Sequence, residues 1–227
     1  GKGIPVRKFV PAYEGNLRKH ALSVPRCISE CSGIRVFGRR IKSLVFSTDV
    51  AIIKNINADA IIAVYPFTPQ PAITQAIIGV SEVPVFCGVG GGLTNGVRSA
   101  SMAAYVEHQG AYGVVCNSKI GVETIHAIKD AVEIPVVYTV ISENTDIQPY
   151  LTAGVDIINV SGAARTPEIV GTLRQRYPEL PIIATGGPTE ESILATIRAG
   201  ANAITYTPPS SASLFAKTMA GNRSELE

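Results

Sequence analysis

Short apolar runs recur along the chain and fall into two series. One series opens with the phrase Glu-apolar-Pro-apolar around Pro84, Pro135 and Pro181, so successive prolines stand 51 and 46 residues apart. The other series holds the runs ADAIIAVYPF, GAYGVVCN, GVDIINVS and GANAITYT. Apolar runs without polar alternation are typical of strands buried on both faces, as in a parallel sheet.

The segments between these runs have the period of amphipathic helices. Gly110, Gly154 and Gly200 follow three of them, and glycine is the common left-handed cap at a helix end. Thr166-Pro167 and Thr189 supply helix start signals. We predict strands over 41–46, 60–66, 84–88, 112–117, 135–141, 156–161, 181–185 and 203–207. We predict helices over Val97–His108, Val122–Val132, Ile147–Thr152, Thr166–Tyr177, Glu190–Ala199 and near Ser213–Ala220.

Eight strand-helix units, with a repeat of about fifty residues for every two units, predict an α/β protein with a single (β/α)8 TIM barrel over residues 34–227. A doubly wound open sheet is the alternative, but it does not predict the two-unit period. Residues 1–33 hold three prolines and no helical period, so we expect an N-terminal extension, either an arm or a cover for the bottom of the barrel. Residues 34–37 are predicted to form an extra strand paired with the residues that follow Gly38-Arg39-Arg40.

Composition limits the partners that this chain is expected to have. Of its 227 residues, 46% are hydrophobic, and 20 Lys and Arg oppose 18 Asp and Glu. This balance excludes intrinsic disorder and gives no electrostatic footprint for nucleic acid or an anionic membrane. No apolar run approaches the ~20 residues that cross a bilayer, and the first ten residues lack a signal-peptide core. We therefore expect a cytoplasmic protein without nucleic-acid or membrane partners, and the sequence leaves room for a homo-oligomer.

The sequence offers little to a metal ion or a histidine-based mechanism. Cys27 and Cys31 would make half a metal site at most. His108 and His126 fall within predicted helices, His20 falls in the N-terminal extension, and no histidine follows a strand. We therefore predict neither a metal site nor a Ser-His-Asp triad, and no cofactor.

In a TIM barrel the active site lies at the carboxyl ends of the strands, which selects the candidate residues. Gly186-Gly187 joins a predicted strand directly to a helix, and free amides at a helix start can cradle an anion; a simple loop closure is the alternative. Gly90 and Gly91 belong to a second glycine-rich loop, either an anion nest or a lid hinge, whose spacing matches no dinucleotide or Walker motif.

Asp49 and Glu143 follow the first and fifth predicted strands, so they could face each other across the mouth and divide acid and base roles. Helix capping is the alternative for both. Lys119 is the only lysine at a predicted strand end on this side, and a shielded lysine can form a Schiff base with a carbonyl substrate; an exposed lysine is the alternative. Asn117, Asn159 and Ser161 are candidates for orienting a substrate.

The stretch PIIATGGPTEESILATIRAGANAITYT resembles the last quarter of ribulose-phosphate-binding-type barrels. The resemblance implies a phosphate shared between the Gly-Gly loop and the loop after the last strand. In the second loop this chain has Pro208-Pro209, which supply no N–H donor, so the anion would rely on the hydroxyls of Thr207, Ser210 and Ser211. From FVPAYEG to AITYTPPS the chain also resembles uncharacterised bacterial TIM-barrel proteins that carry a generic hydrolase label, which implies hydrolysis. The stretch from Lys119 to Ser161 is faintly similar to transaldolase-type aldolases.

These observations predict a metal-independent enzyme that binds a small phosphorylated or otherwise anionic metabolite at the mouth of the barrel and transfers a proton in a lyase or isomerase reaction. Three alternatives stay open: a hydrolase of a small ester or phosphoester, a non-catalytic barrel that senses a metabolite, and a Schiff-base aldolase that uses Lys119.

Overall fold

Eight parallel strands close into a ring in the order β10-β3-β4-β5-β6-β7-β8-β9 in a computed structural model that describes residues 7–226. The strands are β3 (Ser43–Phe46), β4 (Ala60–Ala63), β5 (Val85–Gly90), β6 (Gly113–Cys116), β7 (Val136–Val140), β8 (Ile157–Val160), β9 (Ile182–Thr185) and β10 (Ala203–Tyr206). The closed ring confirms the predicted TIM barrel, since an open sheet would leave two edges unpaired.

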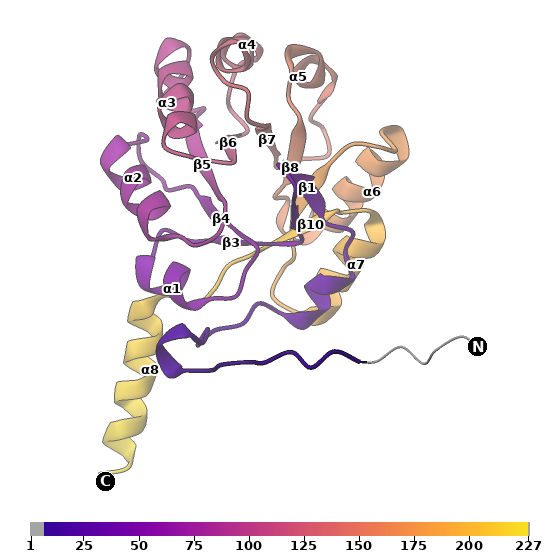
Figure 1. The fold of residues 1–227 in the computed structure, drawn as a ribbon. Coiled ribbons are helices and arrows are strands. Elements are labelled where there is room, and N and C mark those ends of the chain that lie inside the picture. Colours follow the sequence, from indigo (N-terminus) through magenta and orange to yellow (C-terminus); the bar gives the residue numbers. More distant parts are fainter. Residues whose placement is uncertain (1–6, 227) are drawn as a thin grey trace, which may run out of the picture.

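A helix follows each strand on the outside of the ring (Figure 1). The helices are α1 (Val50–Asn55), α2 (Pro71–Val80), α3 (Val97–His108), α4 (Val122–Ala131), α5 (Gln148–Ala153), α6 (Thr166–Arg176), α7 (Glu190–Ala199) and α8 (Ser211–Ser224), with the short turn η3 (Ala163–Arg165) before α6. Two predicted helices, α3 and α7, have the expected bounds. Thr189 opens α7 with a capping box shared with Ser192, as its start signal indicated.

Alternate residues of each strand face opposite sides, as the pleat of a β-strand requires. Leu44, Phe86 and Val137 belong to a cluster that fills the inside of the ring. Their neighbours along the strands, such as Val45 and Cys87, join a larger cluster between the ring and the helices. This division determines which strand-end residues can face the mouth.

A hairpin covers the amino-terminal end of the ring. β1 (Ile34–Val36) pairs antiparallel with β2 (Arg39–Ile41), so the extra strand predicted at 34–37 is present. Its partner begins at Arg39 and not after Arg40 as predicted. Val36 and Ile41 pack into the cluster inside the ring. The bottom of the barrel is therefore covered by this hairpin.

The described part of the N-terminal segment lies along the outside of the barrel. Its short helical turns are η1 (Asn16–Arg18) and η2 (Arg26–Glu30). Cys27 and Ile28 of η2 are buried in the outer cluster, where η2 packs against α7. Leu22 pairs with Ile56 at the end of α1. Residues 1–6 of the predicted arm lie outside the described residues.

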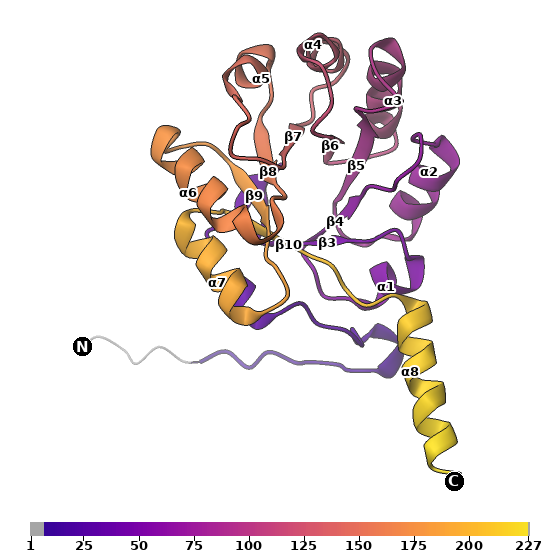
Figure 2. The same ribbon diagram turned by 180° about the vertical axis from the view of Figure 1, so that it is seen from behind.

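The last helix, α8, projects from the barrel beyond α1, and both views show it leaving the body of the molecule (Figures 1 and 2). Residues 211–224 include no buried side chain. Among the helices of residues 7–226, none is both long and apolar enough to cross a membrane.

Candidate functional site

A cavity of about 450 Å³ opens at the carboxyl ends of the strands. Its lining comes from the last inward-facing residues of the strands and from two segments, residues 64–69 after β4 and residues 90–94, which begin at the last residue of β5. Pro66 and Pro69 interrupt the first loop, and proline cannot donate to a strand ladder. β4 ends at Ala63 and not at residue 66 as predicted, and Pro66 could not have donated to the ladder; the residues after Ala63 line the cavity instead.

Neutral polar side chains form one side of this cavity, which we call the polar arc. They stand where the inward-facing series changes from apolar to polar, as from Val137 to Thr139 on β7 and from Ala203 to Thr205 on β10. The polar arc consists of Asn117, Thr139, Asn159, Ser161, Thr185, Thr205 and Thr207. It therefore collects side chains from the ends of five neighbouring strands, β6 to β10.

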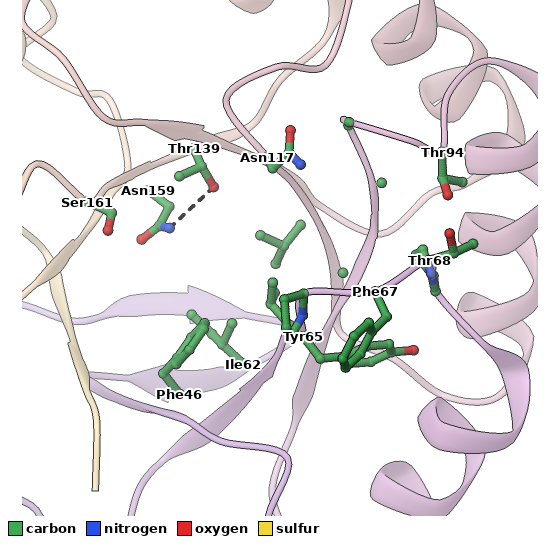
Figure 3. A pocket seen from close by; sticks show the side chains of 18 of the residues that line it. Phe46, Ile62, Tyr65, Phe67, Thr68, Thr94, Asn117, Thr139, Asn159 and Ser161 are labelled. Atoms are coloured by element: carbon green, nitrogen blue, oxygen red, sulfur yellow. Dashed lines mark hydrogen bonds between the residues drawn. The ribbon is translucent and has the colours of Figure 1, made fainter.

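Two buried oxygen atoms of the polar arc have no hydrogen-bond partner within residues 7–226: Asn159 Oδ1 and Thr205 Oγ1. Asn159 Nδ2 donates to Thr139 Oγ1 at 3.4 Å (Figure 3). The Thr185 hydroxyl donates to the main-chain oxygen of Val160 at 3.5 Å. Buried polar atoms are almost always paired, and an unpaired one calls for an explanation. A ligand bound in the cavity would supply the missing partners.

Apolar side chains form the opposite side, which we call the apolar wall: Phe46, Ile62, Val64, Phe67 and Leu93. Figure 3 shows Phe46, Ile62 and Phe67 across the cavity from the labelled members of the polar arc. Phe67 is 71% exposed and Leu93 is 96% exposed. The loop that carries Phe67 is closed by the Tyr65 hydroxyl, which accepts from the main-chain N–H of Gln70 at 2.9 Å.

Of the described residues, those lining the cavity include no Asp, Glu, Lys, Arg or His. The phenol of Tyr65 is the one ionisable side chain among them. Cys87 and Cys116 face the helices, where burial raises the pKa of each thiol to about 12. This mouth can therefore bind and orient a ligand through neutral groups, while any charged group must come from its rim.

Glu143 lies at the rim, in the loop between β7 and α5, outside the lining. It is paired with Arg165, whose Nε donates to Glu143 Oε1 at 2.6 Å. Arg165 also contacts Glu168 at 2.9 Å. A single guanidinium thus holds two carboxylates beside the mouth.

Asp49 also lies outside the lining and caps two helices at once. Its carboxylate accepts from the main-chain N–H groups of Ala51 and Ile52 at the start of α1. It also accepts from the N–H and the hydroxyl of Ser211, at 2.8 and 2.7 Å, at the start of α8. These bonds, led by the one from the Ser211 N–H, lower the pKa of the Asp49 carboxyl below its usual value. The capping alternative therefore accounts for all of the hydrogen bonds of the Asp49 carboxylate, and the structure does not bring Asp49 and Glu143 together over the cavity.

The other predicted residues divide between the lining and its surroundings. Lys119 is exposed and lies outside the lining. Its main-chain N–H donates to Asn117 Oδ1 at 2.9 Å. Ser210 caps α8 by accepting from the Ser213 N–H. Of the three hydroxyl residues after β10, only Thr207 lines the cavity.

Gly186 and Gly187 lie outside the lining as well. The Gly186 N–H donates to the main-chain oxygen of Thr205 at 3.2 Å. The first turn of α7 carries Glu190 and Glu191, whose charges oppose a bound anion. The Gly186 N–H, one of the donors expected to hold a phosphate, is thus already bound to the main-chain oxygen of Thr205.

The second glycine-rich loop does line the cavity, through Gly90, Gly91 and Gly92. Gly91 has a φ of +106°, and a Cβ atom there would overlap Asn117 Oδ1. Glycine at this position therefore lets the loop lie directly against Asn117.

Thr139, Thr185 and Thr205 each stand within the last three residues of a predicted strand, but no role in the site was predicted for them, and the apolar wall was not predicted. The signal that could have found the threonines is their place as the last inward-facing residue of a strand, two positions after an apolar inward residue. Phe67 and Leu93 carry no such signal, because they stand in loops whose path the sequence pattern does not define.

No protein-family model and no curated protein matches the sequence. Solved structures do match the fold. A structure from Burkholderia cenocepacia assigned as a phosphonomutase has a TM-score of 0.63 and 17% identity over 85% of this chain and 95% of that chain. Phosphonopyruvate hydrolase in complex with oxalate and Mg²⁺ has a TM-score of 0.62 and 15% identity, covering 83% of this chain and 82% of that chain.

A third match is 2,3-dimethylmalate lyase, a member of the PEP mutase/isocitrate lyase superfamily, with a TM-score of 0.63 and 12% identity over 88% of this chain and 85% of that chain. These neighbours support a TIM barrel, but not specifically the ribulose-phosphate-binding type or the generic hydrolase group that the sequence resembles. At this level of identity the likeness establishes the fold alone.

The mouth of this barrel does not fit a Mg²⁺ site. Mg²⁺ is usually bound through carboxylates together with substrate oxygens and water. The described lining offers no carboxylate. Residues 7–226 also contain no group of three or more His, Cys, Asp or Glu side chains placed to share a metal ion. We therefore derive no chemical step through a metal.

Proposed function

We propose that this chain binds a small anionic metabolite in the cavity at the barrel mouth and transfers a proton on it in a lyase or isomerase reaction. The observation that carries the proposal is the pair of buried, unpartnered oxygens in the polar arc, Asn159 Oδ1 and Thr205 Oγ1. A buried oxygen without a protein partner costs stability, and a ligand that hydrogen-bonds to it would restore that stability.

The polar arc suits an oxygen-rich anion. The hydroxyls of Thr139, Ser161 and Thr205 can donate to carboxylate or phosphoryl oxygens, and Asn159 Oδ1 can accept from a hydroxyl of the ligand. The apolar wall lowers the local dielectric, which strengthens each of these hydrogen bonds. Phosphonopyruvate and 2,3-dimethylmalate, named for two of the structural neighbours, are small anions of this general kind.

Glu143 is the proposed proton acceptor, and Arg165 is the group that controls it. Arg165 holds Glu143 at the rim through their hydrogen-bonded ion pair. A negatively charged ligand at the mouth competes for the same guanidinium, because Arg binds carboxylates and phosphates with similar geometry. Release from Arg165 would leave the Glu143 carboxylate free to reach the bound metabolite.

Binding is tested by calorimetry with inorganic phosphate, oxalate, malate and phosphoglycolate at millimolar concentration. We expect at least one to bind, and we expect Asn159→Leu, which is close to Asn in shape, to weaken that binding about tenfold by removing its hydrogen bonds. Asn222→Leu, on the exposed helix α8, serves as the matched control and should bind as the wild type does. If none of the four compounds binds, the proposed substrate class is wrong.

The reaction is tested with malate and phosphoglycolate, the two of these compounds that have carbon-bound hydrogen next to a carboxylate, by following its exchange with deuterium from D₂O by NMR. The wild-type protein should catalyse exchange next to the carboxylate. Glu143→Gln should bind the acid with similar affinity and exchange it at least 100-fold more slowly, the usual scale for loss of a general base. Exchange that is unchanged in Glu143→Gln would remove Glu143 from the mechanism.

A non-catalytic barrel that senses the metabolite is a second candidate, and the uncharged lining favours it. A sensor would bind malate or phosphoglycolate without any exchange or turnover in the wild-type protein. Binding without exchange would therefore select this candidate over the enzyme, while the site stays the same.

A further inference from the structure

The cavity has two chemically different sides, and from this we infer that its substrate is a 2-hydroxy acid with an aryl or alkyl tail. The hydroxyl and carboxylate would meet the polar arc, and the tail would lie on the apolar wall. This inference rests on the proposed function, because it specifies the substrate class of the same site.

The head group follows from the hydrogen-bonding capacity of the polar arc. Asn159 Oδ1 is an acceptor and needs a donor, which a carboxylate lacks and an alcohol supplies. The hydroxyls of Thr205 and Ser161 can donate, and a carboxylate accepts from several donors at once. Asn159 and Ser161 come from β8 and its carboxyl end, and Thr205 comes from β10, with β9 between the two strands. A hydroxyl adjacent to a carboxylate provides both functions in one head group.

The tail follows from the exposure of the apolar wall. Phe46, Phe67 and Leu93 come from three separate segments, yet all three line the same cavity and are exposed. Figure 3 shows Phe46 and Phe67 on the side away from Asn159 and Ser161. Exposed apolar groups that gather at a concave site mark a binding surface more often than those scattered singly. The polar and apolar sides are opposite each other, so one ligand can contact both.

Cavity size and charge agree with a substrate that has a tail. The volume of about 450 Å³ falls in the range of sites that enclose drug-sized ligands. A three-carbon acid on the polar arc would leave the apolar wall in water. Because the described lining offers only neutral donors to a carboxylate, burial of a tail would add affinity to what the polar arc and Arg165 supply.

The test measures dissociation constants for a homologous series: lactate, 2-hydroxybutanoate, 2-hydroxyhexanoate and 3-phenyllactate. We expect binding to tighten along the alkyl series by up to about fourfold for each added methylene group that leaves water. 3-Phenyllactate should bind more tightly than lactate, and 3-phenylpropanoate, which lacks the hydroxyl, should bind about tenfold more weakly than 3-phenyllactate because Asn159 Oδ1 stays unpaired.

A pair of variants tests whether the tail of the ligand lies on the apolar wall. Phe67→Ala should weaken 3-phenyllactate binding about tenfold and leave lactate binding within about twofold, since only the longer acid reaches that ring. Phe67 is exposed in the ligand-free protein, so the variant should fold normally. Phe215→Ala removes an equally exposed ring on α8 and should change neither affinity.

The outcomes separate this inference from the proposed function. Equal binding of all four hydroxy acids, or weaker binding of the longer ones, overturns the tail while the small-anion site stands. No binding of any hydroxy acid, together with binding of phosphate or phosphoglycolate, overturns the 2-hydroxy acid head. Failure of both sets of compounds overturns the proposed function itself.

Discussion

Replacement of Asp49 by asparagine should destabilise the protein by about 2 kcal/mol at pH 7, as expected for the loss of a helix cap and a charged hydrogen bond. One oxygen of the Asp49 carboxylate accepts from α1 and the other from the Ser211 N–H. Asparagine keeps one acceptor but sets an NH₂ group against the second donor. Chemical denaturation followed by circular dichroism measures the change.

The effect of this variant should depend on pH in a defined direction. The folded pKa of Asp49 lies below the usual 3.8, so the charged carboxylate stabilises the folded state above about pH 4. That contribution falls as the pH drops through the lowered folded pKa. The difference in unfolding free energy between wild type and Asp49→Asn should therefore be full at pH 7 and smaller near pH 3.

Two further variants separate capping from catalysis at Asp49. Ser211→Ala removes one hydroxyl donor and keeps the N–H, so it should lose part of the stability that Asp49→Asn loses. Glu143→Gln alters an exposed ion pair at the rim and should change stability little. Unchanged stability in Asp49→Asn, with activity lost, would instead support the catalytic role expected from the sequence.

Asp49 also shows which contacts a local sequence pattern can predict and which it cannot. Its position after Ser47-Thr48 indicates a helix cap, and the structure confirms a cap on α1. Its strongest partner, Ser211, stands 162 residues further along the chain. No local periodicity joins two loops at such a separation, so the link between α1 and α8 emerges only when the ring closes.

The barrel itself was largely predictable because its signal is repeated. Each unit combines an apolar run with a helical segment, and the prolines of three strands recur at similar spacing. Even so, β5 continues to Gly90 past a shift of register after Gly88, whereas the prediction ended at 88. Glycine runs lack side chains from which a pattern could be read, which left that strand end undefined.

The candidate site was predictable only where strand geometry decides it. Period two along β8 places Asn159 and Ser161 inward, and the structure puts both in the cavity lining. Glu143 and Lys119 follow the strands too, but they lie in loops, where no period fixes a direction. Their charge made them candidates, while the path of the loop placed them outside the lining.

Thr205→Val should make the ligand-free protein more stable than the wild type, by about 1 kcal/mol, because it removes a buried hydroxyl without a partner in the described chain. Valine has nearly the same shape as threonine, so the packing on β10 should persist. For a chain of this length the gain corresponds to about 2–4 °C in Tm, measured by calorimetry.

The same substitution should weaken the binding of a small anionic metabolite about tenfold, since the hydroxyl proposed to donate to it is gone. Thr185→Val is the matched control: its hydroxyl donates to the main-chain oxygen of Val160, so its loss should bring no gain in stability. Binding sites commonly give up folding stability in this way. A Thr205→Val protein no more stable than Thr185→Val would show that the Thr205 hydroxyl is already satisfied without a ligand, and the main support for the proposed site would be lost.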